Sequence, residues 1–151
     1  MEKVQRTIDT IKDKLLSGWL VTVGLSGKDS MMVAHCAVEA LKEAIEEMPS
    51  AGPLYLVTTD TTIENVEVHN YIKSVHKAAV AYGEENALPI RSALLRPSLL
   101  TQPIVSYLGY GKLLRTPQTS VRGRDCAIAW KITPMDTFLK GLREEFQTDK
   151  C

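Results

Sequence analysis

The stretch SGKDS combines a lysine, a carboxylate, two hydroxyls and a glycine, in the order Ser26, Gly27, Lys28, Asp29 and Ser30. Glycine lets the backbone approach a ligand closely, and Lys28 adds a full positive charge. If the stretch opens a helix, unpaired backbone N–H groups add partial positive charge, and this combination binds phosphate. The serine hydroxyls could donate to phosphate oxygens, while Asp29 could cap the helix or help to hold Mg²⁺. The alternative is a plain capped turn.

The apolar pattern around SGKDS predicts a strand before it and a helix after it. WLVTVGL (residues 19–25) is typical of a strand buried on both faces, and residues 30–48 have the pattern of a helix. In an open parallel sheet, ligands bind outside the carboxyl ends of the strands, where the following helix points its N terminus. The turn therefore lies where a phosphate group would bind.

The rest of the chain continues this alternation. Its patterns predict helices near residues 4–17, 65–85 and 132–146, a short helix around 99–108, and strands at 54–59 and 90–95. We therefore expect an α/β fold with right-handed crossovers, in which a parallel twisted sheet has helices on both faces. The glycine- and arginine-rich residues 109–125 are expected to form a long functional loop. No repeat or domain boundary is evident, so we expect one domain over residues 1–151, either complete or part of a longer chain.

The composition is that of a globular domain, with 44% hydrophobic and 24% charged residues. Eighteen basic and eighteen acidic residues cancel, which does not favour coating of nucleic acid or of an anionic membrane, although a local basic patch is compatible with it. No segment has the pattern of a membrane helix or of a signal peptide, so we expect a cytoplasmic protein without membrane contact. The scattered Cys36, Cys126 and Cys151 suit a reducing compartment.

SGKDS is not a Walker A loop or a dinucleotide-binding fingerprint, because GxxxxGK[ST] and GxGxxG are both absent. It resembles the PP-loop of the ATP pyrophosphatases, whose usual form is SGGKDS. When the two are aligned on Lys28, Leu25 and Ser26 stand in place of the serine and the first glycine. Sulfate-activating relatives also have an S-x-GKDS form. The resemblance implies a Rossmann-like fold of the adenine nucleotide alpha hydrolase type, in which residues 26–30 bind the phosphates of ATP.

A second segment, TTDTTIEN (residues 58–65), follows the second predicted strand. It resembles the S/T-D-T-x-x-E-N segment of PP-loop proteins in sulfur metabolism. The resemblance implies that Asp60, Thr61 and Glu64 contact the nucleotide or a metal ion. The alternative is that Asp60 ends the strand and that Glu64 or Asn65 opens the next helix.

A third segment, RGRDCAIAWKITP (residues 122–134), resembles the R-x-C-x-x-x-x-K-I-x-P segment of the sulfurtransferases of DNA phosphorothioation systems, which belong to the phosphoadenylyl-sulfate reductase-like group. Arg124, Cys126, Lys131 and Pro134 match this pattern. Arg124 and Lys131 would neutralise phosphate charge during the reaction. Cations around Cys126 would favour a thiolate that carries sulfur or binds a cluster, and the alternative is a buried structural cysteine.

Together the three segments imply attack of an acceptor oxygen on the α-phosphorus of ATP, with Mg²⁺ held by Asp29 and Asp60 and with Lys28 stabilising the leaving pyrophosphate. The phosphorothioation branch further implies that the acceptor is a DNA backbone phosphate. The sulfur would come from a cysteine desulfurase or another donor, and we expect other phosphorothioation subunits as partners and allow for a homo-oligomer. A basic patch would help to bind DNA; it consists of Lys112, Arg115, Arg122, Arg124 and Lys131.

Several features of the chain differ from these relatives. Phosphorothioation relatives commonly hold an iron–sulfur cluster through several cysteines, whereas only Cys126 matches here, and Cys36 lies mid-helix where apolar packing is expected. The tail EEFQTDKC lacks the ECG-x-H of sulfonucleotide reductases. The small subunit of sulfate adenylyltransferase shares S-x-GKDS but continues as DTGWKF, so it is an alternative. The missing glycine supports another alternative, a non-catalytic ATP-binding regulatory module.

Overall fold

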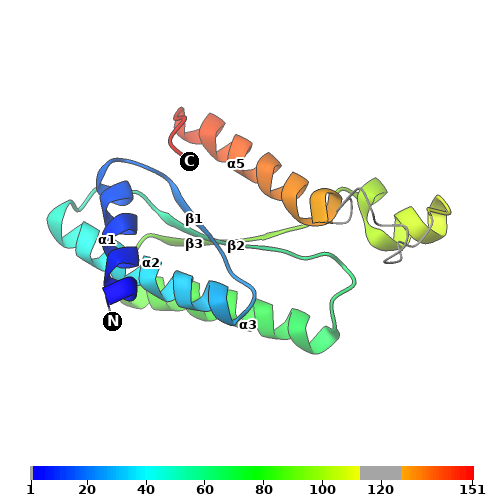
Figure 1. The fold of residues 1–151 in the computed structure, drawn as a ribbon, viewed down its shortest axis with the longest axis horizontal. Helices are drawn as coiled ribbons and strands as arrows, with labels where there is room; N and C mark the ends of the chain where they lie inside the picture. The colour runs from blue at the N-terminus through cyan, green and yellow to red at the C-terminus, as the bar shows by residue number, and fades with distance from the viewer. Residues whose placement is uncertain (1, 113–126) are drawn as a thin grey trace.

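The computed structural model describes residues 2–112 and 127–151, which form an α/β fold (Figure 1). The elements are α1 (Glu2–Leu16), β1 (Val21–Gly24), α2 (Lys28–Glu47), β2 (Leu54–Thr59), α3 (Val66–Glu85), β3 (Ile90–Leu95), the 3₁₀-helix η1 (Leu99–Thr101), the π-helices η2 (Val105–Gly109) and η3 (Ile128–Ile132), and α5 (Thr133–Phe146). The predicted strands and long helices are confirmed. The helix expected over residues 99–108 is instead divided between η1 and η2.

The three strands form a parallel sheet in the order β1-β2-β3, with β2 in the centre. Val21 pairs with Leu54, and Leu54 pairs with Ile90, so the strands run side by side in one direction. The first five residues of β2 are buried, which explains its continuous apolar pattern. Because the strands are parallel, the segments that follow them emerge at the same edge of the sheet.

Helices cover both faces of this sheet, as predicted (Figure 1). Leu54 and Leu56 of β2 point into the core with α2, while α1 packs beside α2. The next side chain in register, Tyr55, points to the opposite face, where Leu142 and Phe138 of α5 cover it. The rings of Tyr55 and Phe138 meet edge to face, with centroids 5.9 Å apart. Helix α5 therefore completes the second layer of the fold.

Helix α3 begins and ends with clear local determinants. The Asn65 side chain accepts a hydrogen bond of 2.8 Å from the backbone N–H of Glu67, which identifies it as the N-cap. Near the other end, Gly83 allows close contact with β3, because a Cβ added there would lie 3.0 Å from Cβ of Ile90. The expectation that Asn65 opens this helix is confirmed.

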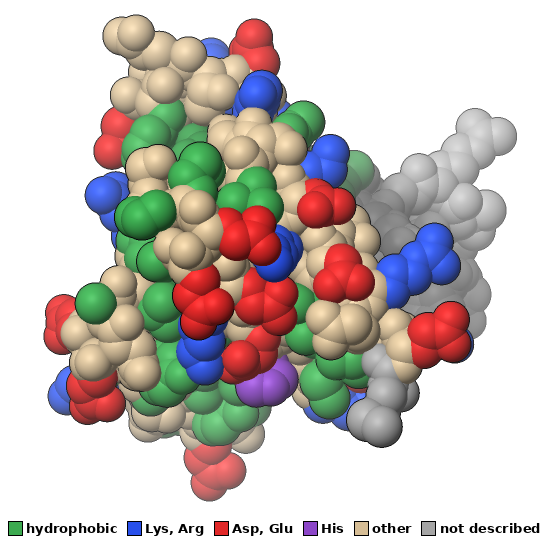
Figure 2. Space-filling view, turned by 90° about the vertical axis from the view of Figure 1, so that its left-hand side faces the viewer, with side chains coloured by type: hydrophobic (Ala, Val, Ile, Leu, Met, Phe, Trp, Pro, Cys, Tyr) green, Lys and Arg blue, Asp and Glu red, His purple; other side chains and the backbone are tan. Residues whose placement is uncertain are grey.

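Figure 2 shows the end of the molecule formed by α1 and the C-terminal half of α2, where acidic and basic side chains are interspersed. Ion pairs account for part of this mixture, since Lys12 lies 3.3 Å from Glu43 and 2.6 Å from Glu47. This face therefore has no continuous basic surface for a nucleic acid.

The structure also bears on two further expectations, the packing of Cys36 and the absence of a membrane-spanning helix. Cys36 is buried in a small apolar cluster with Ile8 and Ala40, which confirms its expected packing role. Among the helices of residues 2–112 and 127–151, none combines the length and the apolar character required to cross a bilayer.

Candidate functional site

The SGKDS turn connects β1 to α2, and its backbone amides converge on one hydroxyl. The N–H groups of Ser26 and Gly27 donate to Oγ of Ser30 at 3.0 and 2.8 Å. The Ser30 hydroxyl in turn donates to the carbonyl of Gly27 at 2.8 Å, rather than outward as expected for a phosphate contact. Gly27 is the N-cap, so the expectation that Asp29 caps the helix is wrong. The Ser30 oxygen occupies a position that a phosphate oxygen would take.

A cavity of about 530 Å³ opens beside this turn, between the ends of β1 and β2 and the start of α5. We call it the nucleotide cavity, after the ligand that is proposed for it below. Its polar wall contains Ser26, Gly27, Thr58, Thr59, Glu64, Lys131 and Asp136, and its apolar wall contains Val57, Val68, Ile72, Ile132 and Met135. Loop amides and a cation beside an apolar wall form a combination suited to a phosphorylated molecule with a flat apolar part.

Only some of the residues that the sequence motifs predicted for the site line this cavity. Ser26, Gly27, Glu64 and Lys131 line the nucleotide cavity. Lys28 and Asp29 lie exposed on the first turn of α2, outside that lining. Four further predicted residues lie outside the described part of the chain; they are Arg115, Arg122, Arg124 and Cys126.

Asp60 is buried, and both of its carboxylate oxygens contact protein donors. Oδ1 accepts a hydrogen bond of 2.9 Å from the backbone N–H of Thr62. Oδ2 accepts one of 3.0 Å from Nε of Arg96, and Nδ1 of His69 lies 3.6 Å from the same oxygen. Through these contacts the Asp60 carboxylate attaches the loop after β2 to the segment after β3.

The other two residues predicted from the second segment contact each other. The hydroxyl of buried Thr61 donates to Oε1 of Glu64 at 3.0 Å. Between them, Thr62 has a φ of 68°, a left-handed conformation that is rare for a β-branched residue, and its buried Oγ1 has no partner among the described atoms. This strained loop places Glu64 between the nucleotide cavity and a smaller one of about 330 Å³ beside Asp60.

Carboxylates suited to a metal ion are sparse in this region. Within residues 2–112 and 127–151, no group of three or more His, Cys, Asp or Glu side chains is arranged to hold a metal ion. Glu64 and Asp136 nevertheless line the nucleotide cavity together. Mg²⁺ is usually bound through one or two carboxylates plus substrate phosphates, so these two residues fit a Mg²⁺ that arrives with a nucleotide.

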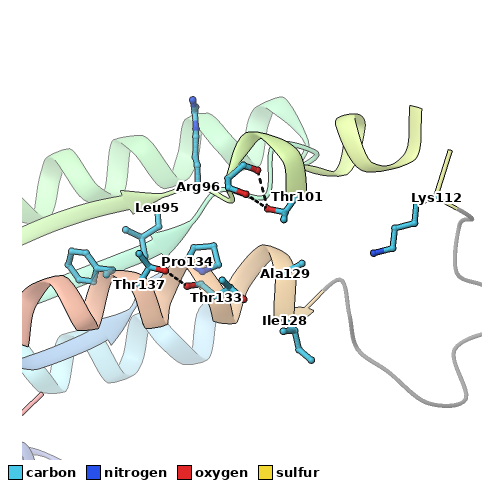
Figure 3. A pocket seen from close by; sticks show the side chains of 11 residues that line it. Leu95, Arg96, Thr101, Lys112, Ile128, Ala129, Thr133, Pro134 and Thr137 are labelled. Carbon is cyan, nitrogen blue, oxygen red and sulfur yellow. Dashed lines mark hydrogen bonds between the residues drawn. The ribbon is translucent and has the colours of Figure 1, made fainter. Parts of the chain in front are cut away.

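A larger cavity, of about 660 Å³, lies between the end of β3, η1 and the start of α5 (Figure 3). Leu95, Pro134 and Phe138 form part of its apolar wall, and Lys112 stands at its far side. Although Arg96 borders this cavity, its side chain points away from α5, toward its partner Asp60. Residues of η3 and the first turn of α5 line both this cavity and the nucleotide cavity, so this segment separates the two.

Three residues of this region were not predicted from sequence: His76, Arg96 and Asp136. Arg96 follows β3 and reaches Asp60 only because the strands are paired in register. Asp136 lies in the first turn of α5, two residues beyond the matched Pro134, and only the docking of α5 brings it to the cavity. His76 is a buried residue of α3 that belongs to none of the three motif segments, and its contacts with Thr58 and Ser92 depend on the packing of α3 on the sheet.

A scan against protein-family models, a search of the curated proteins and a search of the solved structures found no match for this chain. Its function is therefore inferred from its motifs and from the cavity that they line.

Proposed function

We propose that this chain binds ATP in the nucleotide cavity and cleaves it between the α- and β-phosphates, as PP-loop ATP pyrophosphatases do. One observation carries the proposal: all three motif segments contribute to a single cavity. SGKDS supplies Ser26 and Gly27, TTDTTIEN supplies Glu64, and the third segment supplies Lys131. The parallel pairing of β1 and β2 brings the first two segments together, and the docking of η3 and α5 adds Lys131 from a distant part of the chain. The fold would then be of the adenine nucleotide alpha hydrolase type.

The cavity offers a distinct place for each part of ATP. The amides of Ser26 and Gly27 together with the ammonium of Lys131 suit the phosphates. Val68 and Ile72 of α3 form an apolar surface that suits the adenine ring. The amides now contact Ser30, so a phosphate oxygen would replace or share that hydrogen bond.

The chemistry assigned to this site is transfer of the adenylyl group. An acceptor oxygen would attack the α-phosphorus, the bond from that phosphorus to the bridging oxygen would break, and pyrophosphate would leave with the bonding electrons. Lys131 would neutralise the negative charge that develops on the leaving group. Mg²⁺ bound with the phosphates, near Glu64 and Asp136, would supply further charge neutralisation. A sulfur nucleophile could then displace AMP from the acceptor.

The acceptor that we propose is a DNA backbone phosphate, with sulfur incorporation as the outcome. Support comes from the DTTIEN and CAIAWKITP stretches, which most resemble the phosphorothioation branch. The charge on the α1 end is mixed (Figure 2), so DNA would bind near Lys112 and Lys131, at the opposite edge of the sheet, or through partner subunits.

A second candidate is a regulatory module that binds ATP without cleaving it. Two features favour it: Asp60 is already paired with Arg96, and the Ser30 hydroxyl already occupies the converging amides. Such a module would keep the cavity and its affinity for nucleotide but would lack turnover.

Release of pyrophosphate from Mg²⁺-ATP tests the proposal, measured with the purified chain alone and with DNA, with sulfate and with partner proteins. Lys131→Ala should lower kcat/KM roughly 100-fold, since it removes a cation from the developing charge. Lys140→Ala is the matched control, because Lys140 is an exposed lysine further along the same helical segment, near Glu144.

Each outcome selects one function. Stimulation by DNA supports the phosphorothioation proposal, and stimulation by sulfate supports the adenylyltransferase alternative. Binding of ATP without release under any of these conditions supports the regulatory module. A chain that does not bind ATP, or a Lys131→Ala variant as active as the Lys140→Ala control, contradicts the assignment of the cavity.

A further inference from the structure

A chain of hydrogen bonds, buried at Thr58 and His76 and exposed at Ser92, runs behind the phosphate-binding turn and connects β3, α3, β2 and the end of β1. Oγ of Ser92 lies 2.6 Å from Nδ1 of His76, and Nε2 of the same ring lies 2.7 Å from Oγ1 of Thr58. The Thr58 hydroxyl donates to the carbonyl of Leu25, the residue immediately before SGKDS. Thr58 also lines the nucleotide cavity, so this chain ends at the wall of the proposed ATP site.

The direction of each hydrogen bond follows from the groups involved. Thr58 has one hydroxyl proton and gives it to Leu25, so its oxygen must accept a proton from Nε2 of His76. A neutral imidazole with its proton on Nε2 has an unprotonated Nδ1, which accepts from the hydroxyl of Ser92. His76 is 6% exposed, and this burial lowers its pKa and favours that neutral ring.

The hydrogen bond from Thr58 to the Leu25 carbonyl fixes the orientation of the whole peptide unit between Leu25 and Ser26. The carbonyl of Leu25 and the N–H of Ser26 belong to the same planar peptide unit, so in the trans form they point in opposite directions. The Leu25 N–H is held as well, because it donates to the carbonyl of Val57 at 2.9 Å. Holding the Leu25 carbonyl on Thr58 therefore points the Ser26 N–H toward Oγ of Ser30, the position proposed for a phosphate oxygen.

We infer that His76 is a positioning residue for the phosphate-binding turn: through Thr58 it sets the peptide plane between Leu25 and Ser26 and so directs the Ser26 amide at the ligand. The role assigned to the ligand rests on the proposed ATP site. The orientation of the amide itself does not, and it can be measured without nucleotide.

Paired variants of His76 and Thr58 distinguish a role in positioning the turn from a role in packing alone. His76→Leu removes both hydrogen bonds, whereas His76→Gln keeps one donor and one acceptor and should restore the wild-type behaviour. Thr58→Val and Thr58→Ser form a second pair, which decides the case if His76→Leu does not fold. His35→Leu is the matched control, since His35 is exposed on α2.

Two measurements are expected to change together. Affinities for inorganic pyrophosphate and for ATP, measured by calorimetry, should fall about tenfold in His76→Leu and Thr58→Val, the size expected for one lost oriented hydrogen bond. Hydrogen exchange of the Ser26 amide, followed by NMR without ligand, should accelerate about tenfold in the same variants. Adenosine affinity and the His35→Leu control should stay at wild-type values.

Unchanged pyrophosphate affinity and unchanged Ser26 exchange in His76→Leu and Thr58→Val would overturn the inference. Failure of His76→Gln or of Thr58→Ser to restore either property would also overturn it, because a packing defect would then explain the loss. A wild-type chain that binds neither ATP nor pyrophosphate refutes the proposed function, and Ser26 exchange still decides whether His76 positions the turn.

Discussion

Burial of His76 gives the stability of this protein a pH dependence that needs no ligand to measure. Desolvation lowers the pKa of His76 below its ordinary value of 6.5, whereas the unfolded chain keeps the ordinary value. Below about pH 6.5 the unfolded state therefore binds a proton more readily than the folded state, and the free energy of unfolding decreases as pH falls. Above that pH both states are neutral at this residue and the effect disappears.

Urea unfolding from about pH 7.5 to about pH 5.5 tests this prediction. The wild-type protein should lose more stability over this range than His76→Gln, because the variant has no imidazole at position 76. His35→Gln is the control and should follow the wild type, because His35 is exposed. If His76→Gln and the wild type lose the same stability, the prediction for the buried imidazole is wrong.

At the level of single residues, the sequence motifs indicated where some side chains lie but not which side chains contact one another. Lys131 was assigned to a phosphate site, and it lines the cavity beside the SGKDS turn. Asp60 was assigned to a metal or nucleotide, which stays a prediction, while its hydrogen bond with Arg96 was not predicted. That partner could not be predicted, because Arg96 follows a different strand and only the register of the sheet brings the two together.

At the level of elements, hydrophobic periodicity was sufficient to predict the strands and the long helices. The β-branched apolar run LYLVTT coincides with β2, and the helical period over residues 65–85 gave α3 to within one residue. Helix α2 begins at Lys28, two residues earlier than predicted, because Gly27 takes the N-cap. The two short helices η1 and η2 share a segment with Pro103 and too few turns for a clear period, so their division was not predictable.

Packing between α3 and β3 leads to a prediction about two helical glycines. In Gly83→Ala the new Cβ would lie 3.0 Å from Cβ of Ile90 and 3.1 Å from the carbonyl of Leu88, so we expect destabilisation of about 1–3 kcal/mol. Gly141 in α5 has no atom within 4 Å of such a Cβ, so Gly141→Ala should stabilise the protein by about 0.5–1 kcal/mol. Chemical denaturation of both variants provides the measurement. Equal effects of the two substitutions would show that α3 does not pack closely on β3.

At the level of the whole molecule, β2 belongs to two apolar cores at once. Leu54 and Leu56 face the core with α1 and α2, while Tyr55 and Val57 face the core with α5. Sequence could indicate that β2 is buried on both faces, but it could not specify which helix covers which face, because that depends on tertiary packing between elements far apart in the chain. The position of Lys131 in the nucleotide cavity depends on that same docking of α5.

Because the two cores share β2, they should unfold together. Leu142 of α5 is buried at 4% exposure, so Leu142→Ala should lower the free energy of unfolding by about 2–5 kcal/mol. Leu108→Ala is the control, since Leu108 is 83% exposed and should change stability little.

Trp19 lies at the start of the sheet beside Lys14 of α1, and Trp130 lies in η3 with its ring 5.9 Å from that of Tyr107, so each tryptophan reports on a different end of the structure. We expect urea unfolding of the variants Trp130→Phe and Trp19→Phe, each followed by the fluorescence of its remaining tryptophan, to have one midpoint that coincides with the loss of helical circular dichroism. In the Leu142→Ala background both midpoints should shift together, because loss of α5 packing exposes β2 to water on one face and weakens the core on the other. Two separated transitions would instead show that α5 and η3 unfold independently of the sheet, and the nucleotide cavity would then exist only while α5 is docked.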